Sequence, residues 1–136
     1  MVDTNILAKS LEKQGEDANF PFVVNPIPGE VEVLQIVIED REELPIFIST
    51  SDEQILCISY LFAEGELKND VLDKVNNEML LANTAMPLSS FAKINDQYVL
   101  YGAMSVNSSA EDVVHEIQTL SDNTIDAIET MQNYLK

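Results

Sequence analysis

The sequence predicts an α+β fold in which helices pack on an antiparallel meander sheet, in the order helix, three strands, helix, two strands, helix (αβββαββα). Alternating or continuous apolar residues over 31–39, 44–49 and 54–63 are typical of strands that bury at least one face. Apolar residues at steps of three or four over 71–86 and 113–135 predict two amphipathic helices. Short polar turns between successive strands favour antiparallel neighbours.

The N-terminal part contributes a further helix and the turns. Residues 3–14 are expected to form a short amphipathic helix, with Gly15 as its stop signal. Residues 20–29 contain three prolines, so this stretch is expected to be extended or turning and not helical. Charged and polar residues at 40–43 and 50–53 predict the two turns of the meander.

The middle helix has candidate signals at both ends. Asn69 or Asp70 is expected to cap its first turn, because short polar side chains accept hydrogen bonds from the first backbone N–H groups. Pro87 is expected to end it, because proline cannot continue a helix. Between these signals, the apolar stripe consists of Val71, Leu72, Val75, Met79, Ala82 and Met86.

A hairpin and a long helix are predicted to complete the chain. Strands at 91–94 and 97–105 are joined by Asn95-Asp96, a dipeptide suited to a tight turn. Ser108 or Ser109 is expected to cap the last helix.

Length and charge exclude several classes of function. The chain has 136 residues, the size of one domain spanning 1–136, and 46% of its residues are hydrophobic, which favours a folded core. Its 24 acidic and 7 basic residues give a formal net charge of −17, which opposes binding to nucleic acid and to anionic membranes. This charge favours solubility and can steer a basic protein segment to the surface; alternatively, the acids form a solvated face without a partner.

The chain is expected to be cytoplasmic, with no direct insertion into a membrane. Its N-terminus lacks the basic and apolar segments of a secretory signal, and no apolar run reaches the roughly 20 residues of a membrane helix. A single cysteine, Cys57, cannot form an internal disulfide, which fits a reducing compartment.

The sequence predicts no catalytic residue, no metal site and no cofactor. The four glycines lie far apart, so no phosphate-binding loop is available, and one cysteine with one histidine cannot complete a structural zinc site. His115 and Cys57 could in principle pair as base and nucleophile. Cys57 lies in an apolar strand, however, where buried and inert cysteines are common, so packing is the favoured interpretation.

Two groups of residues are candidates for binding a partner. Met79, Leu80 and Leu81 broaden the apolar surface of the middle helix beyond one face, and Met86 adds an adaptable side chain. Ordinary core filling is the alternative to a dimer contact or a groove for another protein. The turn acids Asp40, Glu42 and Glu43 are candidates for steering a basic segment; paired carboxylates can also serve as acid and base or hold an ion, but a solvated turn is favoured.

Two blocks of sequence carry a family resemblance. Residues 44–62 (LPIFISTSDEQILCISYLF) and 86–105 (MPLSSFAKINDQYVLYGAMS) resemble a bacterial family of unknown function typified by YjfI. The family has no established activity, so the resemblance transfers no catalytic residues. Its members are often encoded beside a protein resembling phage-shock protein A, which implies a partner in membrane stress. The element order is also similar to that of type III secretion chaperones and YbjN-like proteins, which are small, often acidic and frequently dimeric.

These observations favour a non-enzymatic protein-binding module: an adaptor or chaperone-like homodimer in a bacterial envelope-stress system, whose partner is another protein with a basic or amphipathic segment. The alternative is a small ligand-binding regulator or enzyme with a carboxylate-lined pocket.

Overall fold

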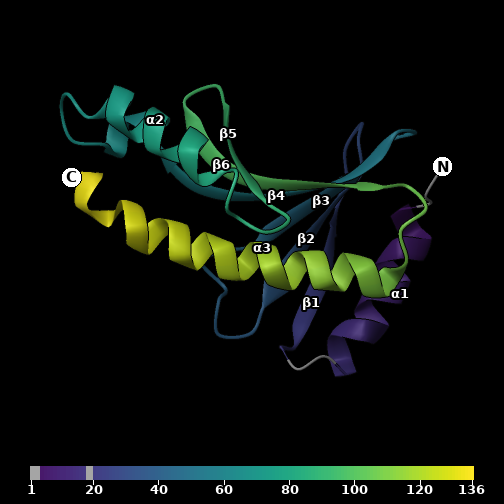
Figure 1. The fold of residues 1–136 in the computed structure, drawn as a ribbon. Helices are drawn as coiled ribbons and strands as arrows, with labels where there is room; N and C mark the ends of the chain where they lie inside the picture. Colours follow the sequence, from purple (N-terminus) through teal and green to yellow (C-terminus); the bar gives the residue numbers. More distant parts are fainter. Residues whose placement is uncertain (1–3, 18–19) are drawn as a thin grey trace.

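The computed structural model, which describes residues 4–17 and 20–136, is an α+β fold of three helices on one antiparallel sheet, as predicted (Figure 1). Asp3, the first residue of the predicted N-terminal helix, lies outside the described residues. The elements in chain order are α1 (Thr4–Asp17), β1 (Phe22–Ile27), β2 (Val33–Ile38), β3 (Ile46–Thr50), β4 (Gln54–Ala63), the 3-10 turn η1 (Glu64–Glu66), α2 (Leu72–Ala82), β5 (Ser90–Ile94), β6 (Gln97–Ser105), α3 (Ala110–Met131) and η2 (Gln132–Tyr134).

The sheet has six strands in the order β1-β2-β3-β4-β6-β5. The predicted three-strand meander is confirmed as β2 to β4, and β1 extends it at one edge. The last two strands depart from a meander, because β6 pairs with β4 and β5 becomes the other edge. A physical reason lies in strand length and burial. The nine-residue β6 pairs along the whole of β4 and contains the buried residues Tyr98, Val99 and Leu100, whereas the five residues of β5 are all partly exposed or exposed.

The predicted order αβββαββα is therefore one strand short, because β1 was expected to be only an extended or turning stretch. Phe22 and Val24 in β1 are buried, and the strand pairs antiparallel with β2. Pro26 sits opposite Leu34 within this pairing. An edge strand tolerates proline because the missing N–H can fall on the unpaired side.

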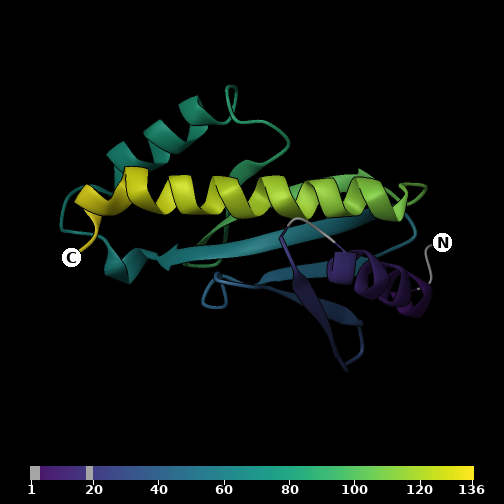
Figure 2. The ribbon, with the colours of Figure 1, turned by 90° about the horizontal axis from the view of Figure 1, so that it is seen from below.

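The core lies between the sheet and the helices, which cover the same face (Figure 2). The predicted alternation in β2 is confirmed, since Leu34, Ile36 and Ile38 are buried and the intervening residues are half-buried. From α3, the buried side chains that meet these strands are Val113, Ile117, Leu120 and Ala127. A smaller cluster lies where α2 meets the end of α3, formed by Phe62, Leu67, Val75, Met79, Tyr98 and Met131.

Gly15 does not stop α1, contrary to the prediction, and the helix continues to Asp17. Gly15 is buried, and a Cβ atom added to it would stand 2.6 Å from the carbonyl oxygen of Phe22. Close approach of the helix to β1 explains this glycine, because any side chain would push the two elements apart.

Both predicted ends of α2 are wrong. Its N-cap is Val71, which makes no side-chain capping bond, while Asp70 adopts a left-handed backbone conformation with φ 65°. The helix ends at Ala82, well before Pro87. Packing of Val75 and Met79 against the sheet therefore holds this helix in place without the help of a cap.

The start of α3 and the last hairpin confirm the local signals. Ser109 is the N-cap: its side chain accepts a hydrogen bond from the backbone N–H of Asp112 at 3.1 Å, and the Asp112 carboxylate accepts one in return from the N–H of Ser109. Asn95 has φ 56° in the turn between β5 and β6, a conformation that asparagine tolerates.

We predict that Ser109→Ala lowers the free energy of unfolding by about 1 kcal/mol, because it leaves the N–H of Asp112 without its capping partner. Ser108→Ala is the matched control and is expected to change stability by less than about 0.5 kcal/mol. Urea unfolding followed by circular dichroism measures both values. Equal effects of the two substitutions would contradict the assignment of the cap.

Candidate functional site

The predicted contact residues on α2 fall into two groups. Leu80 and Leu81 project from the helix with exposed fractions of 69% and 67%. Met79 is 4% exposed and packs in the smaller cluster with Tyr98 and Met131, whereas Met86 is half-buried and packs against the main core. Core filling thus accounts for Met79, while the two leucines form an apolar surface that the described chain does not cover.

A groove lies beside these leucines, between α2 and the edge strand β5. We call it the α2–β5 groove; its volume is about 330 Å3. The side chains and backbone that line it belong to Asn76, Met79, Leu80, Asn83, Phe91, Ala92, Lys93 and Tyr98. Most of its surface is apolar, which suits it to apolar side chains of a ligand or partner.

The polar groups of the groove are already bonded within the chain. The Tyr98 hydroxyl donates a hydrogen bond to Asn76 Oδ1. The Lys93 ammonium forms an ion pair with Glu64 and lies 5.1 Å from the centre of the Tyr98 ring. Because Glu64 neutralises Lys93, this groove offers little attraction for an anionic ligand.

Asn83 forms hydrogen bonds with backbone groups on the unpaired edge of β5. The backbone N–H of Phe91 donates to Asn83 Oδ1 at 2.7 Å, and Asn83 Nδ2 donates to the carbonyl oxygen of Phe91 at 3.5 Å. The side-chain amide therefore stands where the peptide group of a further strand would pair. An extended peptide could add to the sheet at Phe91 only by displacing Asn83.

A second hollow, of about 270 Å3, lies between α2 and α3. Residues from both helices, from the loop between α2 and β5 and from β5 itself line it: Ala82, Ala85, Met86, Phe91, Asn123, Asp126, Ala127, Thr130 and Met131. Asn123 Nδ2 holds this loop to α3 by donating to the Pro87 carbonyl oxygen at 2.9 Å and to Ser89 Oγ at 3.1 Å.

The turn that carries Asp40, Glu42 and Glu43 lies on the other side of α3, and its Arg41 shows this. Arg41, in the turn between β2 and β3, donates hydrogen bonds of 2.8 Å to Ser121 Oγ and to Asp122 Oδ1. Asn123 faces the loop near α2 instead. Since successive helical residues are rotated by about 100°, the two contacts use opposite flanks of α3.

The structure therefore does not bring the turn acids together with the apolar residues of α2. Glu42 accepts a hydrogen bond from the backbone N–H of Asp40 at 3.2 Å, and Glu43 is exposed to solvent. Hollows beside this turn contain carboxylates, and one of about 280 Å3 is lined in part by Glu39, Asp40 and Asp122.

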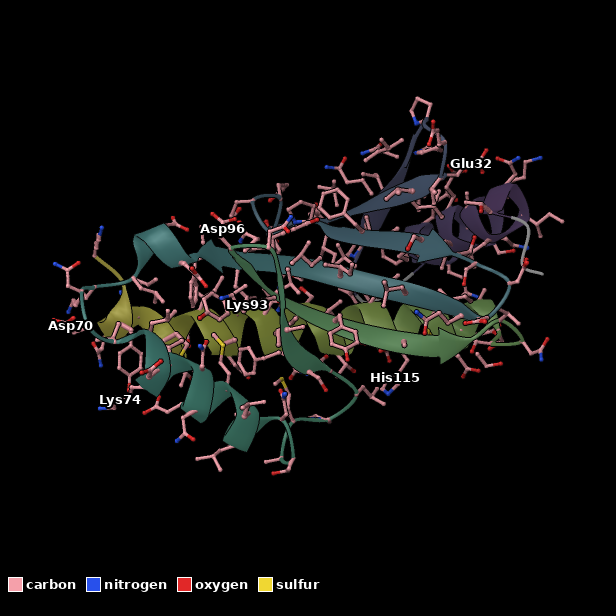
Figure 3. The ribbon with its side chains drawn as sticks, turned by 90° about the horizontal axis from the view of Figure 1, so that it is seen from above. Glu32, Asp70, Lys74, Lys93, Asp96 and His115 are labelled. Atoms are coloured by element: carbon pink, nitrogen blue, oxygen red, sulfur yellow. The ribbon has the colours of Figure 1, made fainter. Side chains whose placement is uncertain are left out.

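Cys57 and His115 do not form a nucleophile and base. Cys57 is fully buried in β4, and burial together with the nearby Glu116 carboxylate raises the pKa of its thiol to about 12. His115 lies exposed on α3, on the surface side of that helix (Figure 3). A thiol that stays protonated at neutral pH cannot act as a nucleophile.

Glu116 is the buried acid of this region. It is 5% exposed, and burial raises the pKa of its carboxyl group, an effect that neighbouring His115 partly offsets. Its carboxylate occupies the space where a Cβ atom on Gly102 would stand, and the Leu88 carbonyl oxygen lies 3.0 Å from the same point. Because Gly102 has no side chain, it leaves room for the Glu116 carboxylate in the core.

Among residues 4–17 and 20–136, no group of three or more His, Cys, Asp or Glu side chains is placed to hold a metal ion. None of the helices in this part of the chain is long and apolar enough to cross a membrane.

Comparison with known proteins identifies the family. Residues 1–135 match the family described as an uncharacterized protein conserved in bacteria (DUF2170). The chain belongs to this family. It is 30% identical over 105 residues to the uncharacterized protein YjfI of Escherichia coli strain K12, and the match covers 74% of this chain and 77% of YjfI. YjfI of strain O157:H7 matches equally. The family resemblance of residues 44–62 and 86–105 is thereby confirmed.

One solved structure shares the fold over almost the whole chain. The crystal structure of the ExsC–ExsE complex matches with a TM-score of 0.52 and 12% sequence identity, covering 99% of this chain and 97% of the other. At this identity the likeness establishes a common fold.

Sequence reasoning missed most of the groove. Of the residues that line it, only Met79 and Leu80 were predicted as contact residues, and the other six were not: Asn76, Asn83, Phe91, Ala92, Lys93 and Tyr98. Their role depends on β5 being an edge strand next to α2, which local patterns do not reveal. The run Met79-Leu80-Leu81 was the available signal, and its first two residues lie in the helical wall of the groove.

We predict that the stability of the fold depends on the ionisation of Glu116. Its pKa in the folded state lies above the usual value of 4.5, so between these two pKa values the folded chain binds more protons than the unfolded chain. The contribution of Glu116 therefore becomes more favourable as the pH falls toward 4.5 and less favourable above the folded pKa. Glu116→Gln should be more stable than the wild type at pH 8, with the difference shrinking at lower pH.

Glu12→Gln is the control, because it removes the same formal charge from an exposed position on α1. Urea unfolding at a series of pH values measures the free energies. A difference between Glu116→Gln and the wild type that does not vary with pH would contradict the prediction.

Proposed function

We propose that this chain is a non-enzymatic, adaptor or chaperone-like protein that holds an amphipathic segment of a partner protein in the α2–β5 groove. The observation that carries the proposal is that Leu80 lines the groove while 69% exposed, and that the next residue, Leu81, is also 67% exposed, so apolar surface of α2 stays open to solvent beside the groove. Burial of such surface by apolar side chains of a partner is favourable by roughly 25 cal/mol per Å2.

Side-chain insertion, not strand addition, is the proposed mode of binding. Asn83 already bonds the N–H and the carbonyl group of Phe91, so a partner gains little from pairing its backbone with this part of β5. A helix laid along α2 can place apolar residues three and four apart into the groove and against the two leucines.

Charge supports a partner segment with basic residues on its polar face. Asp73 and Glu78 lie on α2, and Asp126 lines the hollow between α2 and α3. The whole chain has a net charge of −17, which accelerates encounter with a basic segment. The turn acids Asp40, Glu42 and Glu43 contribute to this long-range field and do not contact the segment.

We also propose the cytoplasm as the site of action and an envelope-stress system as its setting, with a phage-shock-protein-A-like protein as partner. Genes of this family are often found beside one for such a protein, and long amphipathic helices of the kind proposed above would suit the groove. The single buried cysteine, which is free, suits a reducing compartment.

The double substitution Leu80→Asp/Leu81→Asp tests the groove. It should weaken binding of the purified phage-shock-protein-A-like protein at least ~30-fold, about 2 kcal/mol, because it places two charges in the apolar contact. Titration calorimetry or fluorescence anisotropy measures the dissociation constant, and increasing salt should weaken wild-type binding.

Val31→Asp is the matched control, since Val31 is 62% exposed in the turn between β1 and β2, away from α2. It should bind as the wild type does. If both variants bind equally well, the groove is not the contact. A different outcome is that the wild type does not bind this protein but binds another partner, which the double variant fails to bind. The groove would then be confirmed as the contact, and the proposed partner would be wrong.

A further inference from the structure

The face of the sheet that points away from the helices carries no charged side chain within its strands. Outward positions alternate with the buried ones along each strand, as in β2, where Val33, Gln35 and Val37 point away from the core. Charged residues make up 23% of the chain, and exposed positions are where they normally gather. Their absence from all six strands of one face therefore requires an explanation.

One row of paired residues shows how this face is composed. The registers of the five strand pairs place six outward residues side by side across the whole sheet: Asn25, Gln35, Phe47, Ile58, Tyr101 and Ser90. The three central residues are apolar or aromatic, and those at the edges are polar and uncharged. An apolar, aromatic centre with a polar rim is the usual composition of a protein interface.

The neighbouring positions continue the apolar centre. Tyr60 is 45% exposed and its ring meets that of Phe47 edge-on, with 5.7 Å between centroids. At the β1 edge, Val23 is 58% exposed and pairs with Val37. In the part of the chain that the structure describes, no helix lies over this face, which is turned toward the reader in Figure 3 with α3 behind the strands.

The strand sequences have the character of a sheet covered on both faces. A sheet with one solvated face shows apolar residues alternating with polar or charged ones. Here Val33–Ile38 reads VLQIVI and Gln54–Ala63 reads QILCISYLFA, nearly continuous apolar runs. The helices account for one covered face, and the second cover has to come from another molecule.

We propose that a second copy of this chain covers the outer sheet face, so that two sheets stack face to face around a twofold axis. This interface is separate from the α2–β5 groove and leaves it free for a partner. Each copy would present the same surface to the other, as in most symmetric dimers.

The distribution of charge favours a second copy of the chain as the molecule that covers this face. Two chains of net charge −17 repel each other, and the uncharged sheet face is where they can meet without opposing carboxylates directly. A basic partner would gain nothing from a face without acids. Shape agrees, because two sheets of identical twist stack with their strands about 30° apart and their side chains interdigitated.

The face is large enough for such a dimer. Its six strands contain 41 residues, and each residue covers about 3.3 Å along its strand and about 4.8 Å across the sheet. The projected area is therefore about 650 Å2, and it rises further when the relief of the side chains is included. A standard interface buries about 800 Å2 per partner.

Sedimentation equilibrium of the full chain tests the proposal. The wild type should have twice the mass of 15.2 kDa, and Ile58→Asp should weaken self-association at least ~100-fold, because each copy then buries an unpaired carboxylate at the centre of the contact. Increasing salt should tighten the wild-type dimer by screening the repulsion between the chains. Leu80→Asp is the control and should remain dimeric.

Tyr60→Asp gives the same readout at a position that is already 45% exposed, in case Ile58→Asp fails to fold by circular dichroism. A wild type that is monomeric at ~100 μM, or a dimer that withstands both sheet substitutions, would overturn the proposal. A dimer that Leu80→Asp dissociates would place the contact on α2 instead. Binding of a partner to the groove is measured separately and does not depend on this result.

Discussion

The burial of α3 against the middle of the sheet is the interaction on which the rest of the structure depends. Val113, Ile117 and Leu120 have no exposed surface and meet the inner side chains of β4 and β6. Filling this position with a long helix leaves α1 and α2 to pack on either side of it (Figure 1). All three helices consequently share one face, because the strands offer their most apolar inner surface there.

This arrangement leaves two apolar surfaces with different properties. The α2–β5 groove is a small apolar hollow of about 330 Å3, and it lies where α2 packs beside the edge strand β5. The outer sheet face is broad and without charge. A small groove suits individual side chains of a segment, whereas a broad flat face suits another sheet. The two surfaces are therefore suited to different partners, as proposed above.

Much of the fold follows from local patterns. The alternation in β2 and the helical period of α3 depend on which side of an element is apolar, so the sequence predicted both. The missed strand contains Pro26, whose tolerance depends on lying at the edge of the sheet. Gly15 was predicted to end α1 because glycine often follows the last residue of a helix. The structure gives another reason for a glycine at this position, since a side chain there would collide with Phe22.

The sequence by itself determined the α+β class, the net negative charge and two residues of the groove's helical wall, Met79 and Leu80, because composition and short-range periodicity express them directly. It also determined the family, through the blocks at 44–62 and 86–105. Only the tertiary structure decided that β6 lies between β4 and β5 and that Asn83 and Phe91 complete the groove. It also decided that the turn carrying the acids lies on the side of α3 opposite to α2. These features arise from contacts between residues far apart in the chain, which no local pattern encodes.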